Sequence, residues 1–132
     1  KPSSAASDVY KRQIKNIKNV GFQKGERLEK LIREARFSIY PSEWYENCPF
    51  SVMESQMYGA PVLGANIGGI PELIQVGKTG ELFESGNAKD LKQKIEKLWG
   101  DKKLCEEYSK NCKNISFDTI DEYCEKIITV YQ

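Results

Sequence analysis

Hydrophobic and polar residues follow two periods along most of this chain, one typical of strands and one typical of helices. Short apolar runs bounded by glycine, proline or polar turns predict strands, and apolar residues spaced three and four apart predict helices. The predicted strands cover 17–22, 37–40, 61–65 and 81–83. The predicted helices between them cover 25–36, 51–58 and 72–75.

Glycine and proline punctuate these elements in the expected places. Gly59 follows the helix over 51–58 in the usual C-terminal position, and Pro71 suits the first position of the short helix that follows the glycine loop over 66–71. The residues 77–80 form a turn before the last strand.

Three further helices are predicted at the C-terminal end. Asn87 can cap the first of them, with Asp90 as its capping-box partner. Each helix carries an apolar stripe, and such a stripe indicates a face that packs on a core. The stripes consist of Ala88, Leu91, Ile95 and Leu98; of Leu104, Cys105, Tyr108 and Cys112; and of Ile120, Tyr123, Cys124, Ile127, Ile128 and Tyr131.

Strands that alternate with helices predict an α/β fold, a Rossmann-like parallel sheet with helices on both faces. In such sheets ligands bind beyond the carboxyl ends of the strands. The loops that follow Phe22, Tyr40 and Ala65 are expected at that edge. These loops carry Gln23, Glu46 and the pair Gly68 and Gly69, which the fold therefore brings to one crevice.

Length and charge narrow the classes of protein. The 132 residues fit one domain, and 20 basic residues against 19 acidic ones leave no charge pattern for nucleic acid. No apolar run approaches the roughly 20 residues that span a bilayer, and the N-terminus lacks the apolar stretch of a signal peptide. Residues 1–13 are Ser/Ala-rich and patternless, so we expect a disordered or non-native leader there and the folded domain over 14–132.

Cysteine and histidine usage excludes several chemistries. The chain has no histidine, which removes Ser-His and Cys-His nucleophile systems. Its four cysteines form no Cys-x-x-Cys pair, so a zinc site is not expected. Cys105 and Cys112 lie seven apart on one helix face, which indicates buried thiols in a reducing compartment.

Two glutamates, Glu46 and Glu54, lie on either side of the start of the helix over 51–58. A helix start offers unpaired N–H groups and the positive end of the dipole, which favour an anion, above all phosphate. Glu54, one turn inside, can accept hydrogen bonds from two vicinal hydroxyls, as on a ribose. Two non-functional alternatives stay open. Ser51 can be a plain helix cap, and Glu54 can be a solvated surface residue. Against the second, the neighbours of Glu54, namely Val52, Met53 and Met57, indicate a largely buried region.

Other site chemistries are less well supported. A pair of carboxylates also fits a glycoside hydrolase, but here the phosphate-binding helix end lies between the two. Gly68 and Gly69 permit close backbone approach to a ligand, with a tight turn as the alternative. The chain has neither a Walker loop nor Gly-x-Gly-x-x-Gly, which argues against mononucleotide kinases and dinucleotide oxidoreductases.

Five segments in order make the chain similar to a known family. They are Pro41-Ser42, Glu46-x₇-Glu54, Met57-Tyr-Gly-Ala-Pro-Val62, Gly68-Gly-Ile-Pro-Glu72 and Gly77-Lys-Thr-Gly-Glu-Leu-Phe83. Together they resemble the C-terminal, nucleotide-sugar-binding domain of the family-4 (group 1) retaining glycosyltransferases, which have two Rossmann-like domains. The resemblance runs from about Ile17 to Tyr131.

This resemblance implies a role for each candidate residue. Glu46 is the candidate catalytic residue and contacts the donor sugar near its reacting carbon, while Glu54 holds the ribose hydroxyls. The reaction is transfer of a sugar from a nucleotide donor to an acceptor hydroxyl with retention, without a metal or other cofactor, and positive groups stabilise the leaving diphosphate. The remaining donor-binding residues are Phe50 and Ser51 at the diphosphate, Phe22 and Gln23 at the base, and the loop with Gly68 and Gly69.

Two departures from the family pattern stand out. Many members have Phe-Gly where this chain has Cys48-Pro49, and proline has no N–H, so one phosphate donor is lost. Nothing before Ile17 matches the β-α units with an arginine and a lysine that neutralise the diphosphate in the family. The chain is therefore expected to be an incomplete C-terminal half of a two-domain glycosyltransferase with a helical tail, inactive alone.

The resemblance leaves partners and alternatives open. It implies a UDP- or GDP-sugar donor and an acceptor glycan, lipid-linked sugar or small molecule bound by an N-terminal domain. It also implies a bacterial enzyme of polysaccharide biosynthesis in the cytoplasm, with peripheral association at the inner face of the membrane as a further option. A non-catalytic Rossmann-like association module is the alternative function. A sugar-nucleotide epimerase fits less well, because epimerases usually place histidine in the cleft.

Overall fold

Three short parallel strands form the sheet at the centre of this computed structural model, which describes residues 15–131. β1 (Ser38–Tyr40), β2 (Val62–Ala65) and β3 (Gly80–Phe83) lie in chain order, with Ser38 beside Val62 and Val62 beside Gly80. Parallel neighbours need a crossover connection between them. The helices are α2 (Glu26–Glu34), α3 (Phe50–Met57), α4 (Ile70–Leu73), α5 (Ala88–Gly100), α6 (Lys102–Cys112) and α7 (Ile120–Val130).

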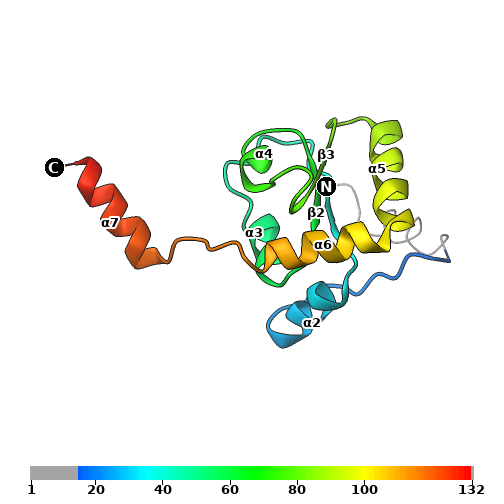
Figure 1. Ribbon diagram of the computed structural model, residues 1–132, viewed down its shortest axis with the longest axis horizontal. Coiled ribbons are helices and arrows are strands. Elements are labelled where there is room, and N and C mark those ends of the chain that lie inside the picture. The colour runs from blue at the N-terminus through cyan, green and yellow to red at the C-terminus, as the bar shows by residue number, and fades with distance from the viewer. Residues whose placement is uncertain (1–14, 132) are drawn as a thin grey trace, which may run out of the picture.

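The helices cover the sheet from both sides. In Figure 1 the sheet is seen nearly edge-on, with α3 and α4 on one side of it and α5 on the other, while α6 crosses beside α3 and α5. This arrangement confirms the predicted Rossmann-like α/β fold. The three predicted strands at 37–40, 61–65 and 81–83 are each present to within one residue.

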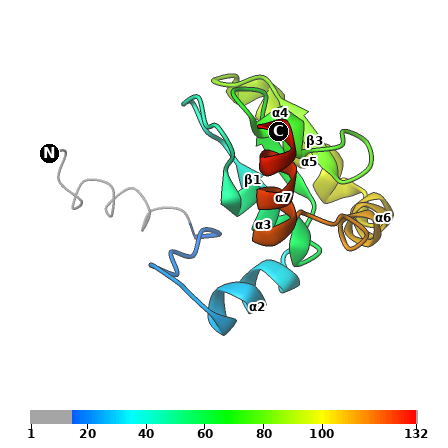
Figure 2. The same cartoon turned by 90° about the vertical axis from the view of Figure 1, so that its left-hand side faces the viewer.

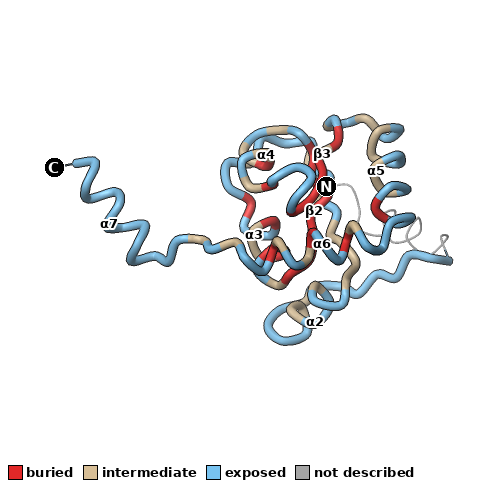
Figure 3. The backbone as a smooth tube through the Cα atoms, in the orientation of Figure 1, coloured by how far each residue is buried: buried red, intermediate tan, exposed pale blue. Residues whose placement is uncertain are grey.

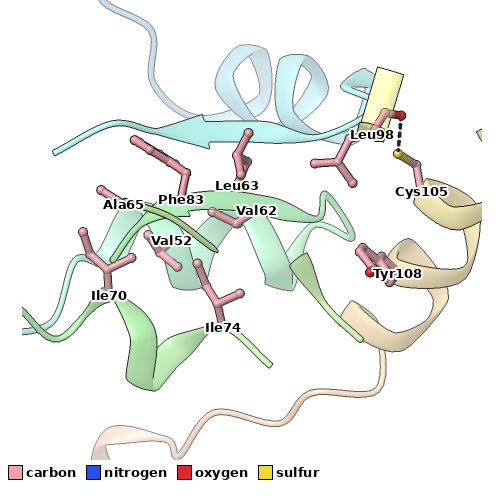
Figure 4. Packing of buried hydrophobic residues seen from close by; sticks show 10 residues of the cluster. All are labelled: Val52, Val62, Leu63, Ala65, Ile70, Ile74, Phe83, Leu98, Cys105 and Tyr108. Atoms are coloured by element: carbon pink, nitrogen blue, oxygen red, sulfur yellow. Dashed lines mark hydrogen bonds between the residues drawn. The ribbon is translucent and has the colours of Figure 1, made fainter. Parts of the chain in front are cut away.

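The core lies between β2 and the elements packed on it. All four residues of β2 are buried, as expected for a central parallel strand covered on both faces. Figure 4 shows side chains from α3, α4, α5 and α6 converging on the strands. The buried cluster consists of Val52, Val62, Leu63, Ala65, Ile70, Ile74, Phe83, Leu98, Cys105 and Tyr108.

A buried carboxylate joins β3 to α5 and α6. Glu81 is 3% exposed, and its carboxylate accepts hydrogen bonds from Lys97 Nζ at 2.6 Å and from the Tyr108 hydroxyl at 2.8 Å. Lys94 Nζ lies 3.5 Å from its other oxygen. Burial acts to raise the pKa of Glu81, but these hydrogen bonds and the two lysine charges outweigh it and hold the pKa below its ordinary value. The carboxylate is therefore charged and paired inside the fold.

The predicted strand over 17–22 is wrong. This segment pairs with no strand among residues 15–131, and its apolar side chains Ile17, Val20 and Phe22 are exposed. Gly21, inside the segment, has a φ of +65°, outside the strand region. Figures 1 and 2 both show the segment running up to the start of α2. The leader expected over 1–13 lies outside the described residues.

Helix α7 is present as predicted, but the prediction that its stripe packs on a core is wrong for the residues described. Figure 3 shows α7 exposed along its length, reached from α6 by an extended segment. Its start has a complete capping box between Thr119 and Glu122, which the sequence reading missed. Among residues 15–131, no helix combines the length and hydrophobicity that a bilayer crossing needs.

The cap of α5 is half of what the sequence predicts. Asn87 accepts hydrogen bonds from the N–H groups of Lys89 and Asp90, both at 3.1 Å. The Asp90 carboxylate does not return a bond to Asn87; it accepts the Glu84 N–H at 2.7 Å instead. Asp90 therefore fixes the chain leaving β3 rather than closing a capping box.

The four cysteines divide into two exposed and two buried thiols, as predicted for Cys105 and Cys112. Burial raises the pKa of both, to about 11 for Cys112. We expect a water-soluble disulfide reagent at pH 8 to label Cys48 and Cys124 rapidly and the buried pair only after denaturation, because the thiolate is the nucleophile. Mass spectrometry of timed samples checks this, and early labelling of Cys112 would contradict the packing of α6.

Candidate functional site

The loops after β1 and β2 meet at the carboxyl edge of the sheet, where the sequence places the site. The loop after β1 is residues 41–49, here called the Glu46 loop, and the loop after β2 is residues 66–69. They touch through their backbones: the Gly69 N–H donates to the Glu46 carbonyl at 2.7 Å. The structure thus brings Glu46, Gly68 and Gly69 together.

The N-terminus of α3 follows the Glu46 loop and is uncapped. Its N-cap is Pro49, which is extended and makes no side-chain cap hydrogen bond. The Val52 N–H bonds to the Pro49 carbonyl, but the N–H groups of Phe50 and Ser51 have no acceptor among residues 15–131. Both residues are exposed. These two N–H groups are therefore free to bind an anion from solvent.

The alternative of Ser51 as a helix cap is excluded, because Ser51 is the second residue of α3 rather than its N-cap. The N-cap is instead Pro49, at the position where the resemblance leads one to expect glycine in many members. Since Pro49 carries no N–H, the amides offered at this helix end begin with Phe50.

The two glutamates are each half-buried. Glu54 is the fifth residue of α3, and its carboxylate has no hydrogen bond or ion pair with any other residue in the described part of the chain. The setting is less apolar than predicted, because Met57 is 61% exposed although Val52 is buried. Glu54 is therefore neither locked inside the core nor fully solvated, and its oxygens are available to donors.

Gly68 and Gly69 are packed against the chain itself. A Cβ on Gly69 would lie 1.8 Å from the Asn47 carbonyl oxygen, and one on Gly68 would lie 2.5 Å from the Glu46 carbonyl oxygen. Gly68 also has φ +57°, which favours glycine. The close approach expected toward a ligand is, in the structure, an approach to the Glu46 loop.

Phe22 and Gln23 do not join this group. Phe22 is 89% exposed, and the Gln23 side-chain amide donates to the carbonyl of Val20 in its own segment. The expectation that their loop follows a strand and reaches the carboxyl edge is wrong, because residues 17–22 form no strand. Their predicted contact with the base stays a prediction.

Two serines support the Glu46 loop: Ser42, which belongs to the first family segment, and Ser85, which the sequence does not single out. The Ser85 hydroxyl, after β3, donates to the Ser42 carbonyl at 3.1 Å. The Ser42 side chain bonds the backbone N–H and carbonyl of Trp44, both at 3.2 Å. A serine beside Gly86 gives no sequence signal for a contact 43 residues away.

Among residues 15–131, no three acidic, cysteine or histidine side chains gather as a metal site.

Comparison with known protein sequences gives relatives that are longer than this chain. An uncharacterised protein from the cps region of Klebsiella pneumoniae is 27% identical over 124 residues, which are 89% of this chain and 34% of that protein. Sulfoquinovosyl transferase of Arabidopsis thaliana is 35% identical over 89 residues, 65% of this chain and 17% of that protein. The chain thus spans about a third of the length of the first relative and less of the second.

Solved structures share the fold. HepE of Anabaena in complex with UDP superposes with a TM-score of 0.80 at 21% identity, covering 96% of this chain and 35% of HepE. Sucrose-phosphate synthase from Thermosynechococcus elongatus gives 0.81 at 20% identity, covering 96% and 32%. The glycosyl transferases group 1 family matches residues 6–115, most of the sequence. This chain belongs to the group 1 glycosyl transferases.

Proposed function

We propose that this chain supplies the donor-binding part of an enzyme that moves a sugar from a nucleotide-sugar to an acceptor hydroxyl with retention. In this proposal the N–H groups of Phe50 and Ser51 bind the diphosphate and Glu54 binds the ribose hydroxyls. Glu46 meets the donor sugar near its reacting carbon. No metal is required.

The uncapped start of α3 is the observation that carries this proposal. Two N–H groups of exposed residues, unpaired among residues 15–131, lie at the positive end of the helix and favour a diphosphate. Glu54 lies one turn further along the same helix, with a carboxylate that has no partner among the described residues. A ribose attached to that diphosphate has two adjacent hydroxyls, and such a carboxylate can accept a hydrogen bond from each of them.

The chemistry asked of these groups is orientation and charge stabilisation. As the bond between the sugar and the diphosphate breaks, negative charge grows on the leaving oxygens. Amide N–H groups fixed by a helix stabilise that charge without having to reorganise. A sugar held on one side by Glu46 and on the other by the diphosphate presents one face to the acceptor.

The comparisons support the class of donor. HepE of Anabaena has been solved with UDP and with UDP-glucose, so these are suitable probes here. The names of the cps-region protein and of an amylovoran biosynthesis glycosyltransferase of Erwinia amylovora favour polysaccharide biosynthesis. A cytoplasmic bacterial enzyme, acting on a glycan, lipid-linked sugar or small molecule, is the context that we propose.

Titration of the isotope-labelled chain with millimolar UDP and GDP tests the nucleotide site by NMR. We expect the amide signals of residues 50–54 to shift for at least one of them. Glu54→Gln should weaken that binding by about tenfold, since hydrogen bonds to a charged group contribute roughly 1.5–3 kcal/mol.

The control is Glu96→Gln, an exposed carboxylate on α5 that pairs with Lys92, and this variant should leave binding unchanged. If neither nucleotide shifts residues 50–54, the proposed function is wrong. A chain that binds no nucleotide but associates with a partner, equally well with Glu46→Ala and Glu54→Ala, would instead be an association module.

A further inference from the structure

The Glu46 loop is attached to neighbouring segments at two places, at Ser42 and at Glu46 and Asn47. The loop after β2 holds it through Gly68 and Gly69, and the segment after β3 holds it through Ser85. A loop that carries a site residue needs such support, because orientation is lost when the backbone moves by an ångström.

Gly69 makes the closer of the two glycine contacts. Its N–H donates to the Glu46 carbonyl at 2.7 Å, and the space where a Cβ would stand is occupied by the Asn47 carbonyl, 1.8 Å away. Real Cβ atoms essentially never approach another atom so closely, and here the other atom is backbone, which cannot swing aside. Its φ of −83° is ordinary, so glycine is needed for space alone.

Gly68 adds a requirement on conformation. A Cβ there would lie 2.5 Å from the Glu46 carbonyl oxygen and 2.9 Å from the Glu46 nitrogen, and its φ is +57°. Both the space and the left-handed backbone therefore require glycine. The peptide units before and after Glu46 rest directly on this glycine pair.

The backbone N–H of Gly69 is already used in a hydrogen bond within the chain. An N–H group makes one good hydrogen bond, and that of Gly69 is directed at the Glu46 carbonyl. It is therefore not free to donate to a diphosphate, in contrast to the N–H groups of Phe50 and Ser51.

We propose that Gly68 and Gly69 are positioning residues that seat the backbone of Glu46, and that they act on the donor sugar through the Glu46 carboxylate. This inference rests on the proposed function, which assigns Glu46 to the sugar. The site then has two parts. Helix α3 binds the nucleoside diphosphate, and the Glu46 loop, held in place by the two glycines, contacts the attached sugar and distinguishes donors by it.

Three glycine-to-alanine variants separate the effect of lost space from the effect of backbone strain. Gly69→Ala introduces the clash with Asn47 alone, and Gly68→Ala introduces both clash and strain. Gly77→Ala is the matched control, because Gly77 has φ +77° but nothing within 4 Å of a Cβ. Ser85→Ala loosens the other attachment of the loop without a clash, and remains informative if a glycine variant fails to fold.

The first readout needs no ligand. In NMR spectra and hydrogen exchange of the 132-residue chain, Gly69→Ala should move the amide signals of residues 45–47, and the Gly69 amide of the unaltered chain should be protected. Gly77→Ala should leave residues 45–47 in place. If Gly69→Ala leaves them in place too, the seating role is wrong, whatever the chain binds.

The second readout compares UDP with UDP-glucose. The unaltered chain should bind UDP-glucose more tightly than UDP. Gly69→Ala and Ser85→Ala should each lower the ratio of the UDP-glucose affinity to the UDP affinity about tenfold. Each should change the UDP affinity itself by less than about threefold. A uniform loss for both ligands would mean that the glycines only stabilise the fold, and would overturn the inference.

The two proposals can fail separately. If the unaltered chain binds neither ligand, the proposed function fails, and the ligand-free readout still decides whether the glycines seat the loop. If it binds UDP and UDP-glucose equally, the nucleotide site stands, but the loop does not read the sugar and the inference is overturned.

Discussion

Glu81→Ala is expected to destabilise the fold by about 3 kcal/mol, since breaking a buried, hydrogen-bonded ion pair typically costs several kcal/mol. The substitution removes the acceptor of the buried Tyr108 hydroxyl, which is then left without a partner in the core. The loss falls at the lower end of that range because Lys94 and Lys97 are 30% and 50% exposed and can turn to water. Urea unfolding followed by circular dichroism measures it.

A double-mutant cycle with Tyr108→Phe separates the stabilisation due to the hydrogen bond between Tyr108 and Glu81 from the other effects of losing the Glu81 side chain. The two substitutions should be non-additive by roughly 1 kcal/mol or more, because they share one contact. Glu81→Gln keeps the shape and an acceptor for Tyr108, so it should cost less than Glu81→Ala. Additive losses would show that the hydroxyl does not depend on Glu81.

The same carboxylate should make stability depend on pH. Its pKa is lowered in the folded chain relative to the ordinary value of 4.5, so the folded state binds the proton less readily than the unfolded state does. The contribution of Glu81 is therefore complete above about pH 4.5 and is lost as the pH falls through the lower, folded value. The difference in unfolding free energy between the unaltered chain and Glu81→Gln should shrink across that window.

Sequence patterns were sufficient for the three strands because each is a short apolar run between breakers, and burial on both faces of a parallel sheet requires such a run. The same rule failed at 17–22. Its residues Ile17, Val20 and Phe22 resemble a strand, but a strand also needs a neighbour to pair with, and the chain pattern does not show whether one exists. Among residues 15–131 the segment has no strand to pair with, and this lack, rather than its strand propensity, determines that it is not a strand.

Helix α7 shows the same limit for packing. Its stripe is predicted correctly, since the spacing of apolar residues is a local property, whereas the cap at Thr119 is not predicted. Whether the stripe is covered depends on surfaces far away in sequence, and among residues 15–131 it is exposed. A stripe identifies the face that is suited to burial, and gives no information about what covers it.

The candidate site was predictable in place but not in its internal contacts. Topology alone brings the loops with Glu46 and Gly69 to one edge. That Gly69 faces the backbone of Asn47, or that Ser85 holds Ser42, follows from loop conformations that no periodicity encodes. Glu81 was missed for the same reason, because its partners on α5 and α6 follow it by 13 to 27 positions.

Leu98→Ala is expected to cost about 3–4 kcal/mol, and Leu91→Ala, in the same helix, only about 1 kcal/mol. The sequence treats the two leucines alike, as members of one stripe on α5, but Leu98 is 0% exposed in the core while Leu91 is half-buried at its edge. Removing a fully buried leucine side chain leaves a cavity as well as losing its transfer free energy, and such changes cost 2–5 kcal/mol.

The Leu98 carbonyl also accepts the thiol of Cys105 at 3.1 Å, as Figure 4 shows, so the end of α5 and the start of α6 share this part of the core. Alanine is at least as good a helix former as leucine, so helix propensity cannot explain a loss at either position. Urea midpoints of the two variants, measured side by side, give the comparison. Equal losses would mean that α5 packs along its whole stripe, and that the edge position of Leu91 is wrong.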